Sequence, residues 1–296
     1  MDDFSIGTIS LLVSNILLSS YPILIKNYVL SVDTLTQLII RCVVYILLAI
    51  PFMILNKETI GIFTNLVQPK FLLISLVNLI HIYTSYKGFE LLNPGVALST
   101  FYTYPIIQLV LSKIYLGTQF NSNIFYNLFG SLLGVIILNK QLFTTINILD
   151  RTTLGKGLLF ILGAALTESI INIFYKKVNI QNPFTSLYTL YAPSFIIYLL
   201  YIWFKHNGQI KKIFTIDKSI LKKVILFNIL IGGIGYTLRL FSLNKISMSW
   251  FSSLSFTNSI SVFVLGWLLL GEKIKLEHII GTAIIFYNIH KIRTLV

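Results

Sequence analysis

The chain has 296 residues, of which 55% are hydrophobic and only 11% are charged. A soluble domain carries about 25% charged residues, and one soluble core stops growing well before it can bury this much apolar surface. This composition argues against a soluble enzyme, a nucleic-acid-binding module and a secreted disulfide scaffold. Cys42 is the only cysteine, so it has no partner for an internal disulfide.

Apolar segments long enough to cross a bilayer follow one another along the whole chain. A spanning helix needs about 20 mostly apolar residues, and the runs are continuous, whereas the strands of an outer-membrane barrel alternate. The first run lacks a basic leader and exceeds the core of a signal peptide, so we expect a retained helix. Ten spans are predicted, with the boundaries 4–26, 34–55, 71–91, 94–113, 123–139, 155–177, 184–204, 221–243, 246–270 and 277–291.

The net charge of +13 is concentrated between these spans, as in the lysine-rich stretch 211–223. Basic loops of a membrane protein contact lipid headgroups and set the topology, so no nucleic-acid partner is predicted. The bilayer is the expected environment, which means the inner membrane if the source is bacterial. Counts of Lys and Arg mildly favour both termini on the outside.

Three short matches suggest that the chain is an internal duplication. They recur at nearly constant offsets of 150, 151 and 154 residues, which predicts two five-helix units, residues 1–140 and 155–296. Because five is odd, the two units would cross the membrane in opposite directions, as inverted repeats do. The matches are Lys26 with Lys176, Leu92-Asn93 with Leu243-Asn244, and Leu116-Gly117 with Leu270-Gly271.

Gly130 and Gly134 form a GxxxG pair in the fifth predicted span. Such a pair lets two helix backbones approach closely. Two interpretations stay open: packing inside one protomer, which we favour, or the face of a homodimer.

Several of these motifs resemble the EamA family of the drug/metabolite transporter superfamily. Residues 105–117 resemble the family signature of a proline, eleven mostly apolar residues and a glycine. Residues 268–274 with Gly281 resemble its terminal LGE…G pattern, and Arg41 and Lys26 stand where the family often has basic residues. The chain departs from the family at Thr118, Ser259 and Tyr191. The resemblance implies a metabolite or drug transporter, with both termini cytoplasmic in many members.

A polar side chain inside a bilayer must find a partner or line a cavity. Arg41 would bind a substrate carboxylate or phosphate, or pair structurally with a carboxylate. Glu168 would bind an amine, carry a proton, or form a salt bridge to Arg41 or another neighbour. His81 would titrate or pack. The candidate substrate-binding residues are Asn15, Arg41, His81, Tyr104, Gln108, Glu168, Tyr191 and Asn258.

No motif for an enzyme, a metal or a cofactor is recognisable, and without a P-loop the chain cannot drive transport with ATP by itself. The leading hypothesis is a secondary transporter of a small polar or amphipathic organic metabolite, amino-acid-like or cofactor-like. It would work by alternating access, driven by proton coupling or by exchange. The alternatives are a nucleotide-sugar or organophosphate exchanger of the same superfamily, a membrane enzyme, and a non-transporting membrane scaffold.

Overall fold

The computed structural model describes residues 2–20, 32–92, 94–140, 150–205, 216–271 and 273–296, and every regular element in these ranges is helical. Lys26 and Glu272, which carry part of the family resemblance, lie outside the described residues. The helices of the first half are α1 (Asp3–Ser19), α3 (Thr34–Leu55), α4 (Thr59–Val67), α5 (Pro69–Leu91), α6 (Pro94–Phe101), α7 (Tyr104–Leu116) and α8 (Ser122–Leu138).

The helices of the second half are α9 (Arg151–Val178), α10 (Pro183–Lys205), α12 (Lys218–Phe227), the π-helix η3 (Asn228–Gly235), α13 (Tyr236–Lys245), α14 (Met248–Ser255), α15 (Thr257–Leu270) and α16 (Leu276–Arg293).

Polar caps and left-handed glycines explain where several helices begin and end. Asp2, Asp33 and Asp217 are N-cap residues whose carboxylates accept hydrogen bonds from the first free backbone amides of α1, α3 and α12. At the other end, Gly117 and Gly271 close α7 and α15 with φ of 65° and 66°, a conformation that glycine adopts without steric cost. The repeated Leu-Gly pair therefore ends a helix in both halves of the chain, α7 in the first and α15 in the second.

Six helical segments of the described chain are long and apolar enough to cross a membrane, or seven if the bent pair α4 and α5 forms one span. The ten predicted spans are thus not confirmed as a number. Two further apolar helices, α1 and α8, have 17 residues each and are shorter than the roughly 20 residues that a membrane-spanning helix needs. The chain is an integral, multi-pass, all-helical membrane protein.

Two predicted spans each divide into two α-helices, although each pair still forms one segment long and apolar enough to cross the membrane. The span predicted at 94–113 divides into α6 and α7, with Pro105 in the first turn of α7, where its missing N–H costs nothing. The span predicted at 246–270 divides into α14 and α15 at Phe256, without a proline. The segment 56–70, predicted as a loop, contains α4, which meets α5 at an angle of 74°.

The span predicted at 221–243 is a 28-residue helix from Lys218 to Lys245 with a π-helical centre. Gly232 lies in this centre against α3. A β-carbon there would come within 1.2 Å of the Tyr45 hydroxyl oxygen, so only glycine fits beside this tyrosine. The π-helical centre therefore packs directly on α3.

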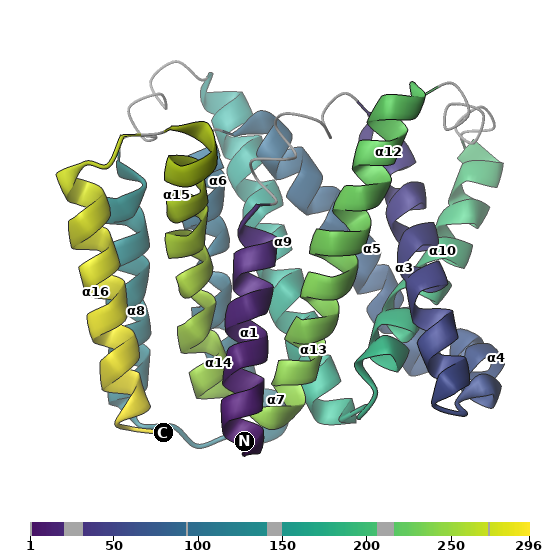
Figure 1. Cartoon of the computed structure of the whole chain (residues 1–296), viewed down its shortest axis with the longest axis horizontal. Helices are drawn as coiled ribbons and strands as arrows, with labels where there is room; N and C mark the ends of the chain where they lie inside the picture. The colour runs from purple at the N-terminus through teal and green to yellow at the C-terminus, as the bar shows by residue number, and fades with distance from the viewer. Residues whose placement is uncertain (1, 21–31, 93, 141–149, 206–215, 272) are drawn as a thin grey trace.

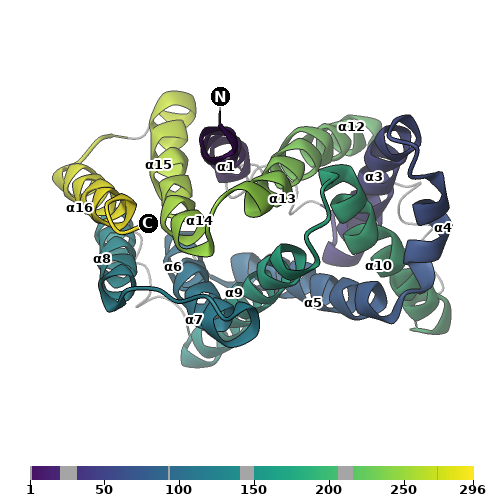
Figure 2. The ribbon, with the colours of Figure 1, turned by 90° about the horizontal axis from the view of Figure 1, so that it is seen from below.

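Figure 1 shows the helices standing side by side, with the N- and C-termini at the same end of the bundle. Helix α1 rises from that end, whereas α9, its counterpart in the second half, starts at the opposite end (Figure 1). Seen along the helices, α8 and α16 form a pair at one edge, and α3, α4 and α10 lie at the other (Figure 2).

The glycines of the GxxxG pair, Gly130 and Gly134, lie in α8, at the edge of the bundle where α8 packs against α16. A β-carbon on Gly130 would lie 2.5 Å from the Asn288 side chain, and one on Gly134 would lie 2.9 Å from the Gly281 carbonyl oxygen of α16. The two glycines therefore let α8 and α16 approach within one protomer, as the favoured interpretation predicted.

Candidate functional site

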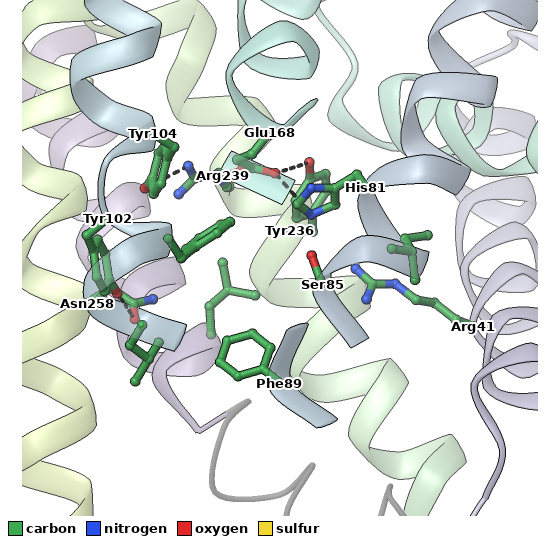
Figure 3. A pocket seen from close by; sticks show the side chains of 14 residues that line it. Arg41, His81, Ser85, Phe89, Tyr102, Tyr104, Glu168, Tyr236, Arg239 and Asn258 are labelled. Atoms are coloured by element: carbon green, nitrogen blue, oxygen red, sulfur yellow. Dashed lines mark hydrogen bonds and ion pairs between the residues drawn. The ribbon is translucent and has the colours of Figure 1, made fainter. Parts of the chain in front are cut away.

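A cavity lies in the middle of the bundle and is lined from both halves of the chain (Figure 3). Its empty volume is ≈ 750 Å³ with the open space at its mouth included, of which the centres of water molecules can occupy ≈ 110 Å³. Four ionisable side chains reach it, and all are almost fully buried: His81 is 9% exposed, Arg41 7%, Glu168 4% and Arg239 3%. The remaining lining residues are Leu18, Ile82, Ser85, Phe89, Leu98, Phe101, Tyr102, Tyr104, Tyr236 and Asn258.

Glu168, on α9, is the centre of the charged network. Its Oε1 lies 3.0 Å from Nε of Arg239, and its Oε2 lies 3.4 Å from Nε2 of His81. The Tyr236 hydroxyl donates to Oε2 at 3.4 Å, and the Asn172 amide donates to Oε1 at 3.3 Å. Arg239, Tyr236 and Asn172 thus compensate the desolvation of the carboxylate, as a buried charge requires, and His81 adds to them when it is protonated.

Arg239 and His81 are each held in place from a second side. Nη2 of Arg239 donates to the Tyr104 hydroxyl at 3.0 Å, and its guanidinium lies over the rings of Tyr104 and Phe251, 5.3 and 4.8 Å from their centroids. Nδ1 of His81 lies 3.1 Å from the Ala164 carbonyl oxygen. Because Nδ1 forms a hydrogen bond with the Ala164 carbonyl oxygen of α9, Nε2 is the ring nitrogen that faces Glu168. This position is compatible with both hypotheses for His81, packing and titration.

Arg41 lies across the cavity from Tyr102 and Asn258 (Figure 3). Its Nε and Nη2 donate to the Tyr191 hydroxyl at 3.2 and 3.0 Å, and its guanidinium lies over the rings of Tyr45 and Tyr191. Tyr191 stands 150 positions after Arg41, so the two residues at matching places of the halves touch each other. The salt bridge considered between Arg41 and Glu168 is replaced by the pair of Glu168 with Arg239.

Five of the eight predicted site residues line the cavity: Arg41, His81, Tyr104, Glu168 and Asn258. The other three lie behind its wall. Tyr191 positions Arg41, and Asn15 donates to the Leu254 carbonyl oxygen and to Thr257 where α14 breaks into α15. Gln108 accepts from Asn172 and donates to Ser252.

Sequence reasoning missed Arg239 as a cavity residue. A helix expected to end at 243 puts Arg239 near the membrane surface, but the helix continues to Lys245 and the side chain is 3% exposed. The signal was available, because Arg239 shares a polar and small-residue stripe with Asn228, Gly232 and Gly235. Tyr236 and Ser85 were also missed as cavity residues, although Ser85 shares one helix face with His81 at a spacing of four residues.

The cavity therefore offers positive and negative groups, aromatic faces and amide groups to a bound molecule. No group of three or more His, Cys, Asp or Glu side chains that could hold a metal occurs in the described ranges. The arrangement is suited to reversible binding of a small polar molecule inside a multi-pass membrane protein.

The comparisons with known proteins agree with this class. The model of the EamA-like transporter family matches the sequence twice, at residues 5–140 and 155–289. The chain therefore belongs to the EamA-like transporter family, a family of membrane transporters rather than enzymes. A solved structure titled only "Crystal structure of protein" is similar over 99% of this chain and 98% of its own, with a TM-score of 0.79 and 13% identity. This likeness concerns the fold. No curated protein matches the sequence.

Proposed function

We propose that the chain is a secondary transporter of a small amphipathic organic metabolite that carries one anionic group. The observation that carries this proposal is the cavity, because four buried ionisable side chains from α3, α5, α9 and α13 surround space at the centre of the bundle. A charged side chain in the bilayer is costly unless it pairs or serves a pathway.

The charge of the cavity limits the substrate. Among the residues that line the cavity, Glu168 balances the charge of Arg239, and Arg41 is the second cation. A guanidinium binds a carboxylate as a two-pronged fork. Phe89, Phe101 and Tyr102 offer apolar faces elsewhere in the cavity, and Asn258 offers an amide across from Arg41. A carboxylate with an apolar or aromatic body and a hydrogen-bonding group matches these features.

The second candidate is the exchange of organophosphates or nucleotide sugars, and Arg239 is the observation that favours it. With Arg41 it gives the cavity two guanidinium groups instead of one. A phosphate monoester carries about −1.5 to −2 charges at neutral pH, and Glu168 cancels one of the two cations. The charge balance therefore ranks this candidate below a singly charged carboxylate.

Alternating access would use the two five-helix units, residues 1–140 and 155–296, as inverted repeats around this cavity. The opposite directions of α1 and α9 and the contact between Arg41 and Tyr191 support that arrangement. Glu168 and His81 are the candidates for proton coupling, because they face each other across 3.4 Å. Exchange of two metabolites is the alternative driving force.

Counterflow in liposomes tests the proposal. Purified protein is reconstituted with a panel of unlabelled metabolites inside, and labelled carboxylates are offered outside. Saturable uptake that Arg41→Ala abolishes and Arg41→Lys restores only in part is the expected result, because lysine lacks the planar fork. Unchanged uptake by Arg41→Ala would contradict the role of Arg41, and the absence of saturable flux for every class would favour the scaffold.

A further inference from the structure

The state of one carboxylate decides whether the central cavity can bind a substrate that carries an ammonium group. Among the described residues that line the cavity, Glu168 is the only acid, whereas Arg41 and Arg239 are cations. An amino acid brings an ammonium group, which has three donors and no acceptor. A buried cation of this kind is costly unless it is paired and hydrogen-bonded, so it would need Glu168 to have spare acceptor sites.

The acceptor sites of Glu168 are taken by the protein itself. A carboxylate has about four lone-pair sites. Oε1 accepts from Nε of Arg239 at 3.0 Å and from the Asn172 amide at 3.3 Å, and Oε2 accepts from the Tyr236 hydroxyl at 3.4 Å. Nε2 of His81 lies 3.4 Å from the same Oε2, and only 5% of the Glu168 side chain is exposed. An ammonium group would therefore have to displace one of these neighbours.

An ammonium group at this place would also meet a like charge. Nε of Arg239 lies 3.0 Å from Oε1 of Glu168, so an ammonium bound to the carboxylate would lie beside the guanidinium and be repelled by it. Neutral acceptors of the cavity are engaged as well. The Tyr104 hydroxyl accepts from Arg239, and the Asn258 amide oxygen accepts from the Tyr102 hydroxyl. A molecule without an ammonium group leaves all of these contacts intact.

Ser85 supplies a polar group that the protein leaves unused. Its side chain lines the cavity (Figure 3) and is only 7% exposed, yet its hydroxyl has no hydrogen-bond partner within the described ranges. The hydroxyl of the neighbouring Thr84, in contrast, donates to the Ile80 carbonyl oxygen of its own helix at 2.7 Å. A buried hydroxyl without a partner is destabilising. A bound carboxylate would accept from the Ser85 hydroxyl and remove this cost.

The surroundings of Ser85 along α5 fit an anion with an apolar body. His81 stands four residues before Ser85 and Phe89 four residues after it, so the three side chains share one face of the helix, and all three line the cavity. One end of this face therefore lies beside Glu168 and the other end is apolar. A carboxylate at Ser85 would have Phe89 available for its apolar body.

We propose that the cavity binds carboxylates without an ammonium group, such as 2-hydroxy and 2-oxo acids, and that the Ser85 hydroxyl donates to the bound carboxylate. This inference rests on the proposed function and narrows its substrate class, because it excludes amino acids. Ser85 selects the anion, and Glu168 rejects the ammonium because its acceptor sites are filled.

Thermal stabilisation of the purified full-length protein at neutral pH tests binding separately from transport. The ligands are leucine and phenylalanine, each with the 2-hydroxy acid and the 2-oxo acid of the same carbon skeleton. We expect at least one hydroxy or oxo acid to bind about tenfold or more tightly than the matching amino acid, which is the value of one hydrogen bond to a charged group. An amino acid that binds as tightly as its hydroxy acid, or no binding by any of the acids, would overturn the inference.

Variants of the named residues sharpen the test. Ser85→Ala should weaken the hydroxy and oxo acids about tenfold without lowering the melting temperature of the unliganded protein, and Ser85→Thr should retain part of the affinity. Thr84→Val, which removes a hydroxyl outside the cavity, is the matched control and should bind normally. Tyr236→Phe frees one acceptor site of Glu168 and should narrow the preference against amino acids. Full affinity in Ser85→Ala, or a preference unchanged in Tyr236→Phe, would contradict the inference.

Counterflow of the same ligands in liposomes separates this inference from the proposed function. Binding of a hydroxy or oxo acid without saturable counterflow would refute secondary transport and support the substrate class. Saturable counterflow of an amino acid at the rate of its hydroxy acid would support transport and refute the substrate class.

Discussion

The buried pair of Glu168 and Arg239 predicts an asymmetric response to mutation. Glu168→Gln leaves a guanidinium that cannot lose its proton. Removing one partner of a buried pair costs about 3–5 kcal/mol. The Tyr104 hydroxyl and the two aromatic faces near Arg239 still compensate part of its charge, since a desolvated cation–π contact contributes about 2 kcal/mol. We therefore expect a loss of about 3 kcal/mol, at the lower end of that range.

Arg239→Met should cost less. The carboxylate it leaves keeps His81, Tyr236 and Asn172, and it can take up a proton, which the guanidinium cannot release. The loss should shrink as the pH falls, because protonation of either Glu168 or His81 removes the unpaired negative charge. Glu168→Gln should show no such dependence.

The double variant Glu168→Gln with Arg239→Met should be less destabilised than Glu168→Gln alone, because no charge remains unpaired. Unfolding in mixed micelles with increasing denaturing detergent measures all four proteins, with Lys87→Gln as a control that removes the more exposed pair of Lys87 with Glu90. Additive losses, or an Arg239→Met variant that is the less stable of the two single variants at low pH, would refute the reasoning.

Other predictions concern the packing around the cavity. Gly134→Leu should destabilise the protein by about 1–3 kcal/mol through overpacking against α16, which a lower melting temperature would show. The oligomeric mass measured by light scattering should not change. A smaller oligomeric mass without a loss of stability would place Gly134 on a dimer face instead. Gly232→Ala should fold poorly, and replacing Tyr45 by Ala in the same chain should recover folded yield in size-exclusion chromatography; no recovery would contradict the contact. Tyr191→Phe removes the oxygen that accepts from Arg41 and should weaken substrate affinity in counterflow about tenfold or more, whereas Tyr198→Phe on the same helix should leave it unchanged.

The positions of helices were readable from the sequence, but their interruptions were not. Apolar runs predicted α3 at its observed boundaries and α5, α9 and α10 within a few residues, because burial in lipid demands an uninterrupted apolar stretch. The breaks at Phe256 and in the π-helical centre depend on neighbouring helices, which no local pattern records. Pro105 gave a local signal for the first break, whereas Phe256 gave none.

Charge explains why part of the site was predictable. Arg41 and Glu168 stand near the middle of apolar runs, where an ionisable residue is conspicuous, and both line the cavity. Arg239 is just as buried, but it stands near the predicted end of its span, where a basic residue is ordinary. Tyr191 and Gln108 were candidate substrate-binding residues, and for Gln108 an interhelical hydrogen bond was equally expected. Both lie behind the cavity wall, because depth along a helix says nothing about which side of it faces the cavity.

The π-helical centre of the long helix sets the rotational phase of everything that follows it. A π-helical turn holds an extra residue compared with an α-helical turn, and one residue corresponds to about 100° of rotation. Shortening 228–235 by one residue would swing Arg239 by that angle, away from Glu168. The offset between the halves is 150 at Lys26 and Lys176 and 151 at Leu92 and Leu243. The rotational phase set by the π-helical centre brings the Arg239 guanidinium to the cavity, on a helix whose first-half counterpart, α5, brings His81 there.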